Sequence, residues 1–238
     1  MRHLKQIPLS NPVPEAVAAT FDLSMAPAYL SHFGVLLLRQ CIPLELIEHW
    51  LPRFEAGFAA ADAAVHTGTM SVNAFKNIYS YGHAHPEYIP GYRQWPLALL
   101  EHTAFRQLLG HCLGDAFALM WQNAYPRRQG QYREHAIDWH RDTDFLGPVK
   151  GVVNTWIPMT QAGGDFPGLE FVCFDGQHWS PQMQPGDLLL FHCTVRHRTQ
   201  INAAPHRQSP VRLSSELRWI PETEYSLTRS WLYHVPPL

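Results

Sequence analysis

The residues in this sequence best suited to chemistry are a histidine and an aspartate two positions apart, His140 and Asp142. On an extended strand, alternate side chains point to the same face, so this spacing predicts that the imidazole and the carboxylate converge. A third ligand has to come from elsewhere in the chain, and His197 is the best candidate. Two imidazoles and one carboxylate on one face of an octahedron leave three positions open. That arrangement suits non-haem Fe(II), which must also bind a co-substrate and O₂.

The spacing alone is a weak signal, because the chain contains 15 histidines. A second pair, His85 and Glu87, is separated by a proline that cannot donate to a strand ladder, which favours a loop there. Several other histidines compete with His197 for the role of third ligand. They are His178, His192, His206 and His234.

The composition is typical of one globular domain. The 238 residues are 46% hydrophobic and 16% charged, which allows a substantial core. A net charge of -2 provides no basic field for nucleic acid or an anionic membrane, and no apolar run is long enough to span a bilayer. The N-terminus lacks the apolar core of a signal peptide, and four scattered cysteines fit structural thiols in a reducing compartment. We therefore expect a cytoplasmic monomer or homodimer whose partner is a small molecule.

The first half of the chain is predicted to be mostly helical, over residues 21–115. Residues 1–20 contain three prolines and are expected to form an extended arm. Residues 35–39 form a short apolar run that predicts a buried strand. Helices are expected from Pro43, with Pro52 kinking or dividing the first one, and again from Pro96 to a stop at Gly114.

From about residue 116 the pattern changes to strands separated by turns. The last strand alternates almost without error, with apolar residues on one face and Arg212, Ser214, Glu216 and Arg218 on the other. Helices followed by a run of strands predict a mainly β jelly roll with flanking helices. Its core is expected over residues 116–222, followed by a C-terminal tail over 223–238. The candidate strands are 117–123, 152–157, 168–174, 188–192 and 211–219.

Residues 73–95 are rich in both turn residues and aromatic residues. We expect this stretch to fold over the metal as a lid whose rings and phenols shape the substrate pocket. The alternative is a loop that packs on the outer helices, with its rings covering the core. The tyrosines concerned are Tyr79, Tyr81, Tyr88 and Tyr92, and further candidates for substrate binding are Trp156 and Glu216.

Together these segments resemble the phytanoyl-CoA dioxygenase-like branch of the Fe(II)- and 2-oxoglutarate-dependent oxygenases. The resemblance rests on the order and spacing of segments from residue 30 to residue 220, and it implies a double-stranded β-helix, the jelly roll of cupin-like proteins. One departure is the turn at residues 174–178, where many relatives carry Pro-Gly-Ser-His. The matching segments are 33–39, Trp139-His140-Arg141-Asp142, 153–158, 167–172, 186–192, His197-Arg198-Thr199 and Arg212-Leu213-Ser214.

The resemblance implies iron on His140, Asp142 and His197, and a basic residue after the second histidine that binds the distal carboxylate of 2-oxoglutarate. Arg212 and Arg207 both qualify by spacing, and we prefer Arg212 because it opens the alternating strand. Arginine offers paired N–H donors that match a carboxylate. The structural alternative for Arg212 is an ion pair on the barrel wall, with Glu170 or Glu216.

Three further side chains are candidates for contacts to the co-substrate. Thr199 lies two residues after His197 and can add a hydroxyl donor to the distal carboxylate. Asn154 or Gln122 could hydrogen-bond the metal-bound end, and either could equally be structural.

The reaction that the resemblance implies is hydroxylation, or another oxidation, of a C–H bond of a small molecule. In that reaction 2-oxoglutarate is decarboxylated to succinate and CO₂. Asp142 provides the carboxylate that chlorinating relatives lack, so we expect oxygenation and no halogenation. The alternative is a jelly-roll metal-binding protein, or a Zn-dependent hydrolase, that uses the same ligands without O₂. A jelly roll supports many chemistries, so the substrate is not identified by the sequence.

Overall fold

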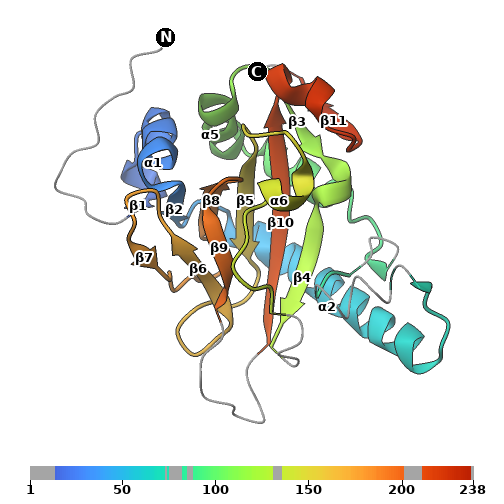
Figure 1. Ribbon diagram of the computed structural model, residues 1–238. Coiled ribbons are helices and arrows are strands. Elements are labelled where there is room, and N and C mark those ends of the chain that lie inside the picture. The colour runs from blue at the N-terminus through green and yellow to red at the C-terminus, as the bar shows by residue number, and fades with distance from the viewer. Residues whose placement is uncertain are drawn as a thin grey trace.

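Two β-sheets face each other, and helices cover the outer face of the larger sheet (Figure 1). A computed structural model describes residues 14–72, 74, 82–84, 88–130, 136–200 and 211–236. The larger sheet has the order β1-β2-β8-β5-β10-β3-β11, with β4 also paired to β10, and the smaller sheet has the order β7-β6-β9. The strands are β1 (Glu15–Val17), β2 (Val35–Arg39), β3 (Phe117–Met120), β4 (Tyr125–Gln129), β5 (Val153–Pro158), β6 (Gly168–Val172), β7 (His178–Trp179), β8 (Leu188–His192), β9 (Arg196–Gln200), β10 (Arg212–Pro221) and β11 (Leu232–Val235).

The helices lie mainly in the first half of the chain, as predicted. None of those in the described part of the chain is both long and apolar enough to cross a membrane. The α-helices are α1 (Ala26–Phe33), α2 (Leu44–His66), α4 (Gln94–Glu101), α5 (Thr103–Leu113) and α6 (Thr143–Leu146). Short 3-10 helices are η1 (Ala18–Thr20), η2 (Leu23–Met25), η4 (Trp121–Asn123) and η6 (Glu222–Leu227).

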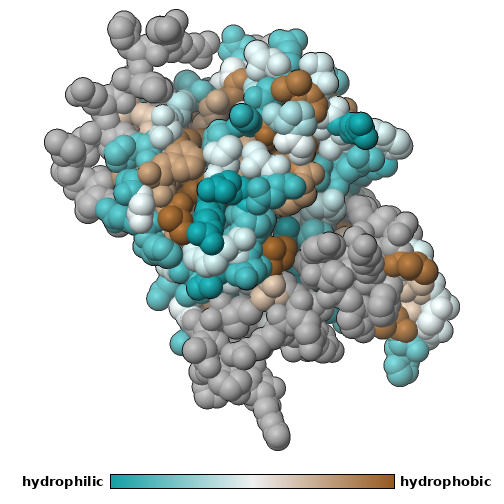
Figure 2. Space-filling model, in the orientation of Figure 1, coloured by the Kyte–Doolittle hydropathy of each residue, from teal (hydrophilic) through white to brown (hydrophobic). Residues whose placement is uncertain are grey.

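The predicted class is confirmed: the protein is a sheet-rich jelly roll with flanking helices. Over the described residues the two sheets do not close into a continuous barrel. On the face shown in Figure 2, which is the side of the smaller sheet, apolar side chains of the described residues form scattered patches among hydrophilic ones.

Strand β10 is the centre of the larger sheet. It pairs antiparallel with β5 along one side, and with β4 and then β3 along the other. The side chains of its first nine residues are all buried, because helices cover one face and the smaller sheet covers the other. Trp95 of α4 donates from Nε1 to Ser215 Oγ at 2.8 Å on the helix side. The alternation of residues along β10 therefore separates an apolar face from a polar, inward-facing one.

Three parts of the chain that were predicted to lie outside the jelly roll contribute strands to it. Glu15–Val17 of the predicted arm form β1, which pairs parallel to β2, whereas residues 1–13 lie outside the described residues. The predicted strand at Val35–Arg39 is present as β2 and pairs with β8. Leu232–Val235 of the predicted tail form β11 against β3. These short segments gain their backbone hydrogen bonds from strands distant in sequence, which local patterns do not reveal.

Helix α2 continues through Pro52, so the predicted division there is wrong. The proline lacks the N–H that would bond to the carbonyl four residues earlier, at Glu48, and both residues face solvent, where water can bond that carbonyl. Trp50 and Phe54, on either side of the proline, are both buried in the core, so both halves of the helix are fixed by packing.

The core between β10 and the helix layer gives a stability prediction. Trp219 is fully buried, donates from Nε1 to Thr155 Oγ1 at 2.9 Å, and packs edge-on against Phe105 of α5. Trp219→Ala should lower the free energy of unfolding by about 3–5 kcal/mol, the usual cost of removing a buried aromatic side chain. The matched control is Trp231→Ala, whose side chain is 70% exposed and should cost less than about 0.5 kcal/mol. Denaturant unfolding measures both, and equal losses would contradict this assignment of the core.

Candidate metal centre

The first two candidate ligands are joined by their backbones. His140 and His197 exchange a pair of hydrogen bonds, N to O at 3.0 Å in each direction, which attaches the segment before α6 to the edge of β9. Their imidazole rings lie 4.3 Å apart between centroids, on the inner side of the smaller sheet. The two histidines therefore meet although they are 57 positions apart in the sequence.

Asp142 reaches the site by a turn, so the prediction of one extended strand through both His140 and Asp142 is wrong. Asp142 has helical backbone angles (φ -63°, ψ -29°) and is the N-cap residue of α6. Its carbonyl oxygen accepts hydrogen bonds from Phe145 N at 3.1 Å and Leu146 N at 2.9 Å. The carboxylate and the imidazole converge because the chain bends after His140, and not because residues alternate along a strand.

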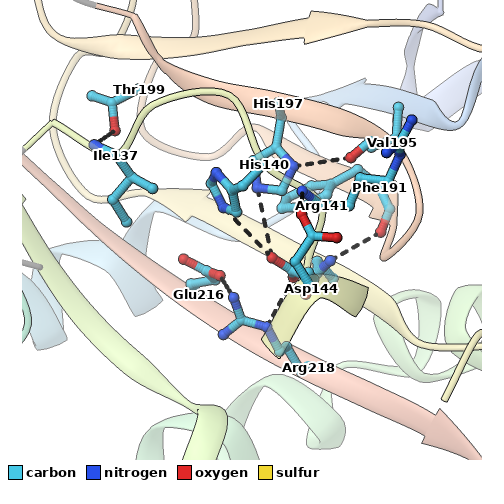
Figure 3. A network of polar contacts seen from close by, with 12 residues as sticks. Ile137, His140, Arg141, Asp144, Phe191, Val195, His197, Thr199, Glu216 and Arg218 are labelled. Atoms are coloured by element: carbon cyan, nitrogen blue, oxygen red, sulfur yellow. Dashed lines mark hydrogen bonds and ion pairs between the residues drawn. The ribbon is translucent and has the colours of Figure 1, made fainter. Parts of the chain in front are cut away.

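The three side chains are arranged as ligands of one ion (Figure 3). Asp142 Oδ1 lies 3.8 Å from His140 Nε2 and 3.7 Å from His197 Nε2. Each histidine bonds a backbone carbonyl through Nδ1, at 2.7 Å to Asp138 O and 3.1 Å to Val195 O. Nδ1 must then be the donor, which leaves the lone pair of each Nε2 directed at the carboxylate.

Two observations show that this donor set fits a cation. Asp142 is fully buried, and its Oδ1 has no hydrogen-bond partner, which is costly for a buried carboxylate oxygen. Burial lowers the pKa of His197 to about 4, outweighing the opposite effect of Asp142, so its imidazole is neutral and able to ligate near pH 7. Two imidazoles and one carboxylate match the preferences of Fe(II).

Arg218 holds the carboxylate in place, and sequence analysis did not assign it this role. Its Nε donates to Asp142 Oδ2 at 2.9 Å, and its guanidinium also bonds Glu216 and the carbonyl oxygen of Asn123. Burial would raise the pKa of Asp142, but the charge and hydrogen bond of Arg218, together with the two histidines, lower the pKa overall, so the carboxylate is ionised. Because Arg218 occupies Oδ2, only Oδ1 faces the two histidines. The one available signal was the inward polar row of β10, to which Arg218 belongs.

The competing histidines lie elsewhere. His178 is exposed, and its Nδ1 lies 3.4 Å from Glu170 Oε1. His192 Nδ1 forms a hydrogen bond with Thr194 Oγ1 at 2.7 Å, in the turn that follows β8. His234 is exposed, and its ring makes an edge-to-face contact with Tyr225. His206 lies outside the described residues. The structure therefore brings only His197 of these candidates to His140 and Asp142 among the residues it describes.

An inner cavity lies between the two sheets beside the triad, and Arg212 is in its wall. Arg212 is 2% exposed, its Nη1 donates to Gly168 O at 3.2 Å, and its Nε has no hydrogen-bond partner. Burial, with a smaller effect of the positive charge of Arg127, lowers the pKa of Arg212 to about 9, although the charge of Glu216 acts in the opposite direction. Among the described residues, no carboxylate lies within ion-pair distance of its guanidinium. A buried arginine in this condition is stabilised by a bound anion.

The two acidic residues proposed as structural partners of Arg212 are occupied by other arginines. Glu170 accepts from Arg198 Nε at 2.7 Å, and Glu216 pairs with Arg127 Nε at 2.5 Å and with Arg218. The ion-pair alternative for Arg212 is therefore wrong. Arg207, the other candidate for the anion site, lies outside the described residues.

Thr199, Trp156 and Glu216 line the same inner cavity, as their predicted roles require. Thr199 Oγ1 accepts from Ile137 N at 3.3 Å, and the Trp156 ring lies 5.1 Å from the centre of the Arg212 guanidinium. The cavity is only about 20 Å³, close to the volume for one water. A dicarboxylate can enter only if a wall moves, and the wall includes Arg198, whose side chain is 40% exposed.

Asn154 and Gln122 differ in position. Asn154 is buried on β5, directly opposite Arg218 of β10, and its Oδ1 lacks a partner while Nδ2 donates to Phe191 O at 3.4 Å. Gln122 is exposed on η4 and lines a different cavity. Gln122 therefore does not share a cavity with Arg212, and its contact with the metal-bound end of a co-substrate stays a prediction.

The described part of the predicted lid packs mostly as scaffold. Tyr92 is 3% exposed, and its ring lies 5.9 Å from Phe54 of α2, so its predicted substrate contact is wrong. Tyr88 is partly buried against the same core and lines neither cavity. Tyr79 and Tyr81 lie outside the described residues.

Gly82–Ala84 is the part of the predicted lid that runs beside β4. The backbone of His83 forms an isolated antiparallel β-bridge with Arg127 of β4. Its imidazole ring stacks on Tyr125, with ring centroids 4.2 Å apart. Gly82 has φ +64°, and a Cβ there would lie 2.3 Å from Arg128 O, so only glycine permits this close approach to β4. Nothing in the sequence distinguishes His83 from the other histidines of the stretch.

Comparisons with known proteins identify the fold. No protein-family model matches the sequence, and no curated protein matches it. The solved structure of the non-heme alpha-ketoglutarate-dependent epimerase SnoN from nogalamycin biosynthesis matches 84% of this chain and 82% of its own, with a TM-score of 0.60 and 13% identity. The carbocyclase SnoK from nogalamycin biosynthesis matches 94% and 96%, with a TM-score of 0.57 and 12% identity. AviO1 from Streptomyces viridochromogenes Tue57 matches 85% and 96%, with a TM-score of 0.58 and 16% identity. At such identities the likeness establishes the fold alone.

The assignment of the third ligand can be tested by a pair of variants. His197→Ala should weaken Mn²⁺ or Co²⁺ binding by more than about 100-fold, because even residues that only orient a ligand contribute 10–100-fold. His192→Ala should leave the affinity unchanged, since its imidazole bonds Thr194. Calorimetric titration of the metal-free proteins measures both. Loss of binding in the His192 variant alone would refute the assignment.

The role of Arg218 makes a separate prediction. Arg218→Gln should weaken binding of the same metal by about 10–100-fold, since Asp142 then loses the donor that orients it. Arg196→Gln is the matched control, because Arg196 is exposed and packs over Trp139 outside the cavities. An unchanged affinity in a folded Arg218 variant would show that Asp142 needs no such support.

Proposed function

We propose that this protein is an Fe(II)- and 2-oxoglutarate-dependent dioxygenase that hydroxylates, or otherwise oxidises, a C–H bond of a small molecule. The observation that carries the proposal is the position of Asp142 Oδ1, which has no hydrogen-bond partner and lies between two imidazole nitrogens. In the wall of the adjoining cavity, Arg212 has no carboxylate partner among the described residues. Support comes from structures of the same fold, SnoN and SnoK, that are described as non-heme alpha-ketoglutarate-dependent enzymes. The iron, with O₂ and 2-oxoglutarate, would supply the oxidising chemistry.

Each residue of the candidate site has a physical task in this proposal. His140, Asp142 and His197 would hold the metal, and Arg218 keeps the carboxylate ionised and directed at it. Arg212 would bind the distal carboxylate of 2-oxoglutarate through its guanidinium, with the hydroxyl of Thr199 as a second donor in the same cavity. Apart from the partly exposed His140, these groups are buried, which excludes bulk water and strengthens each charged contact.

The finer assignments belong to the same proposal. The sequence resemblance favours the phytanoyl-CoA dioxygenase-like branch, and the carboxylate of Asp142 favours oxygenation over halogenation. A small-molecule substrate, a cytoplasmic location and a monomeric or dimeric state stay predictions from the sequence.

Anaerobic spectroscopy tests the proposal directly. Fe(II) and 2-oxoglutarate added together should produce a visible charge-transfer band that neither produces alone, and exposure to O₂ should then form succinate. A Zn-dependent hydrolase would show no such band and would need neither O₂ nor 2-oxoglutarate. Stoichiometric Fe(II) binding without any effect of 2-oxoglutarate would contradict the dioxygenase and favour the hydrolase or a plain metal-binding protein.

The anchor of the co-substrate gives a quantitative prediction. A hydrogen bond to a charged group contributes about 1.5–3 kcal/mol, so Arg212→Ala should weaken 2-oxoglutarate binding by roughly ten- to hundredfold. Mn²⁺ affinity should stay within about twofold, because Arg212 contacts the carbonyl oxygen of Gly168 and the ring of Trp156, neither of which belongs to a ligand. Titration of 2-oxoglutarate into the Mn²⁺-loaded protein measures the effect, with Arg196→Ala as the control. If Arg207→Ala has this effect and Arg212→Ala does not, the anchor is Arg207.

A further inference from the structure

A second, larger cavity of about 620 Å³ adjoins the charge network at Asn123, whose carbonyl oxygen accepts a hydrogen bond from Arg218. Its walls come from η4, from Tyr125 of β4, from α6 and from the segment that follows η6. Cavities of roughly 300–1,000 Å³ are typical of sites for small organic ligands. The two cavities share no lining residue among those described, so two ligands can be bound at once.

Two walls of this outer cavity are directly connected to the metal centre. Phe145 stands on α6, one helical turn after Asp142, and its ring lies 6.2 Å from the ring of His140. On another wall, the carbonyl oxygen of Asn123 accepts a hydrogen bond at 3.1 Å from Arg218, the residue that holds Asp142. A molecule in the outer cavity would therefore lie against two residues that themselves contact His140 and Arg218.

The apolar part of the lining is unusually exposed. Phe145 is 55% exposed and Leu227 is 44% exposed, and with Tyr125 they give the cavity flat, apolar surfaces. Large apolar side chains in a concave site that are left open to water favour an apolar ligand. Ser230 Oγ donates to Asn123 Oδ1 at 2.7 Å and fixes the segment after η6 to η4, so the cavity walls are tied together.

The only charged residue among the described lining residues is a cation. Arg229 is exposed, and no carboxylate among the described residues lies within ion-pair distance of it. Gln122 adds an uncharged amide at the same cavity. An arginine beside flat apolar walls recognises a ring system that carries an acidic group, because the guanidinium binds a carboxylate in a fork and the rings cover the apolar surface.

We propose that the outer cavity is the substrate site and that its ligand is a flat, ring-containing small molecule with an acidic group, held by Phe145, Leu227 and Tyr125 and oriented by Arg229. This inference rests on the proposed function, because the cavity is a substrate site only if the protein is a dioxygenase. It also moves substrate recognition from the predicted lid tyrosines to η4, α6 and the segment after η6.

The test uses two probes of equal shape, 2-naphthoate and its neutral analogue 2-naphthamide, titrated by NMR into the full-length protein. Wild type should bind naphthoate more tightly than naphthamide. Arg229→Ala should weaken naphthoate about fivefold and leave naphthamide unchanged, as an exposed charge pair predicts. Phe145→Ala should weaken both probes by roughly tenfold through lost apolar contact. Arg196→Ala, outside both cavities, is the control and should change neither.

The position beside the metal is tested in the same samples. Mn²⁺ should broaden the resonances of bound naphthoate in wild type, and it should not do so in His197→Ala, although that variant should still bind naphthoate. Failure of either probe to bind wild type, or equal affinities unaffected by Arg229→Ala and Phe145→Ala, would overturn the proposed ligand class. Binding without Mn²⁺ broadening would overturn the substrate site. A charge-transfer band with Fe(II) and 2-oxoglutarate in those cases would leave the dioxygenase function standing.

Discussion

The metal centre depends on a chain of buried charges that runs from Arg127 through Glu216 and Arg218 to Asp142. Removing such charges from water costs several kcal/mol per ion unless each one has a partner. Every member of this chain has one, and the single oxygen left over, Oδ1 of Asp142, is the one that faces the two histidines. The network therefore prepares a site for one cation and specifies which oxygen binds it.

This network exists because β10 is buried on both faces. Its outward row packs on helices, where Trp219 lies against α5 and Ser215 bonds α4. Its inward row carries Arg212 at one end, the residue proposed to bind an anion, and Arg218 near the other end, which bonds Asp142. A strand covered on one face only could not keep four polar side chains away from bulk water. The helices of the first half of the chain thus support the site although they contribute no ligand to it.

The two cavities have separate linings. Arg212 and Thr199 border the inner one, between the sheets, while Phe145 and Arg229 border the outer one. Arg218 lies between them and contacts both Asp142 and the backbone of η4. Because the cavities share no lining residue among those described, an anion in the inner one and an organic molecule in the outer one would not compete for space.

The sequence by itself determined the elements whose signal is local. The alternation of residues 211–219, the apolar runs at β2 and β8, and the change from helical to strand patterns near residue 116 all correspond to observed structure. The inward orientation of Arg212 also followed from that alternation, because side-chain direction along a strand has a period of two.

Only the tertiary structure decided which side chains meet. Asp142 faces the histidines through a turn and not through strand alternation, and it pairs with Arg218, 76 positions away, because β10 passes beneath that turn. Tyr92 was a plausible substrate contact by composition, yet it packs on α2, and His83 from the same stretch lies beside Tyr125. Such outcomes depend on how strands distant in sequence are aligned and on which buried charges find partners. These are cooperative properties of the packed molecule, so no local pattern in the sequence carries them.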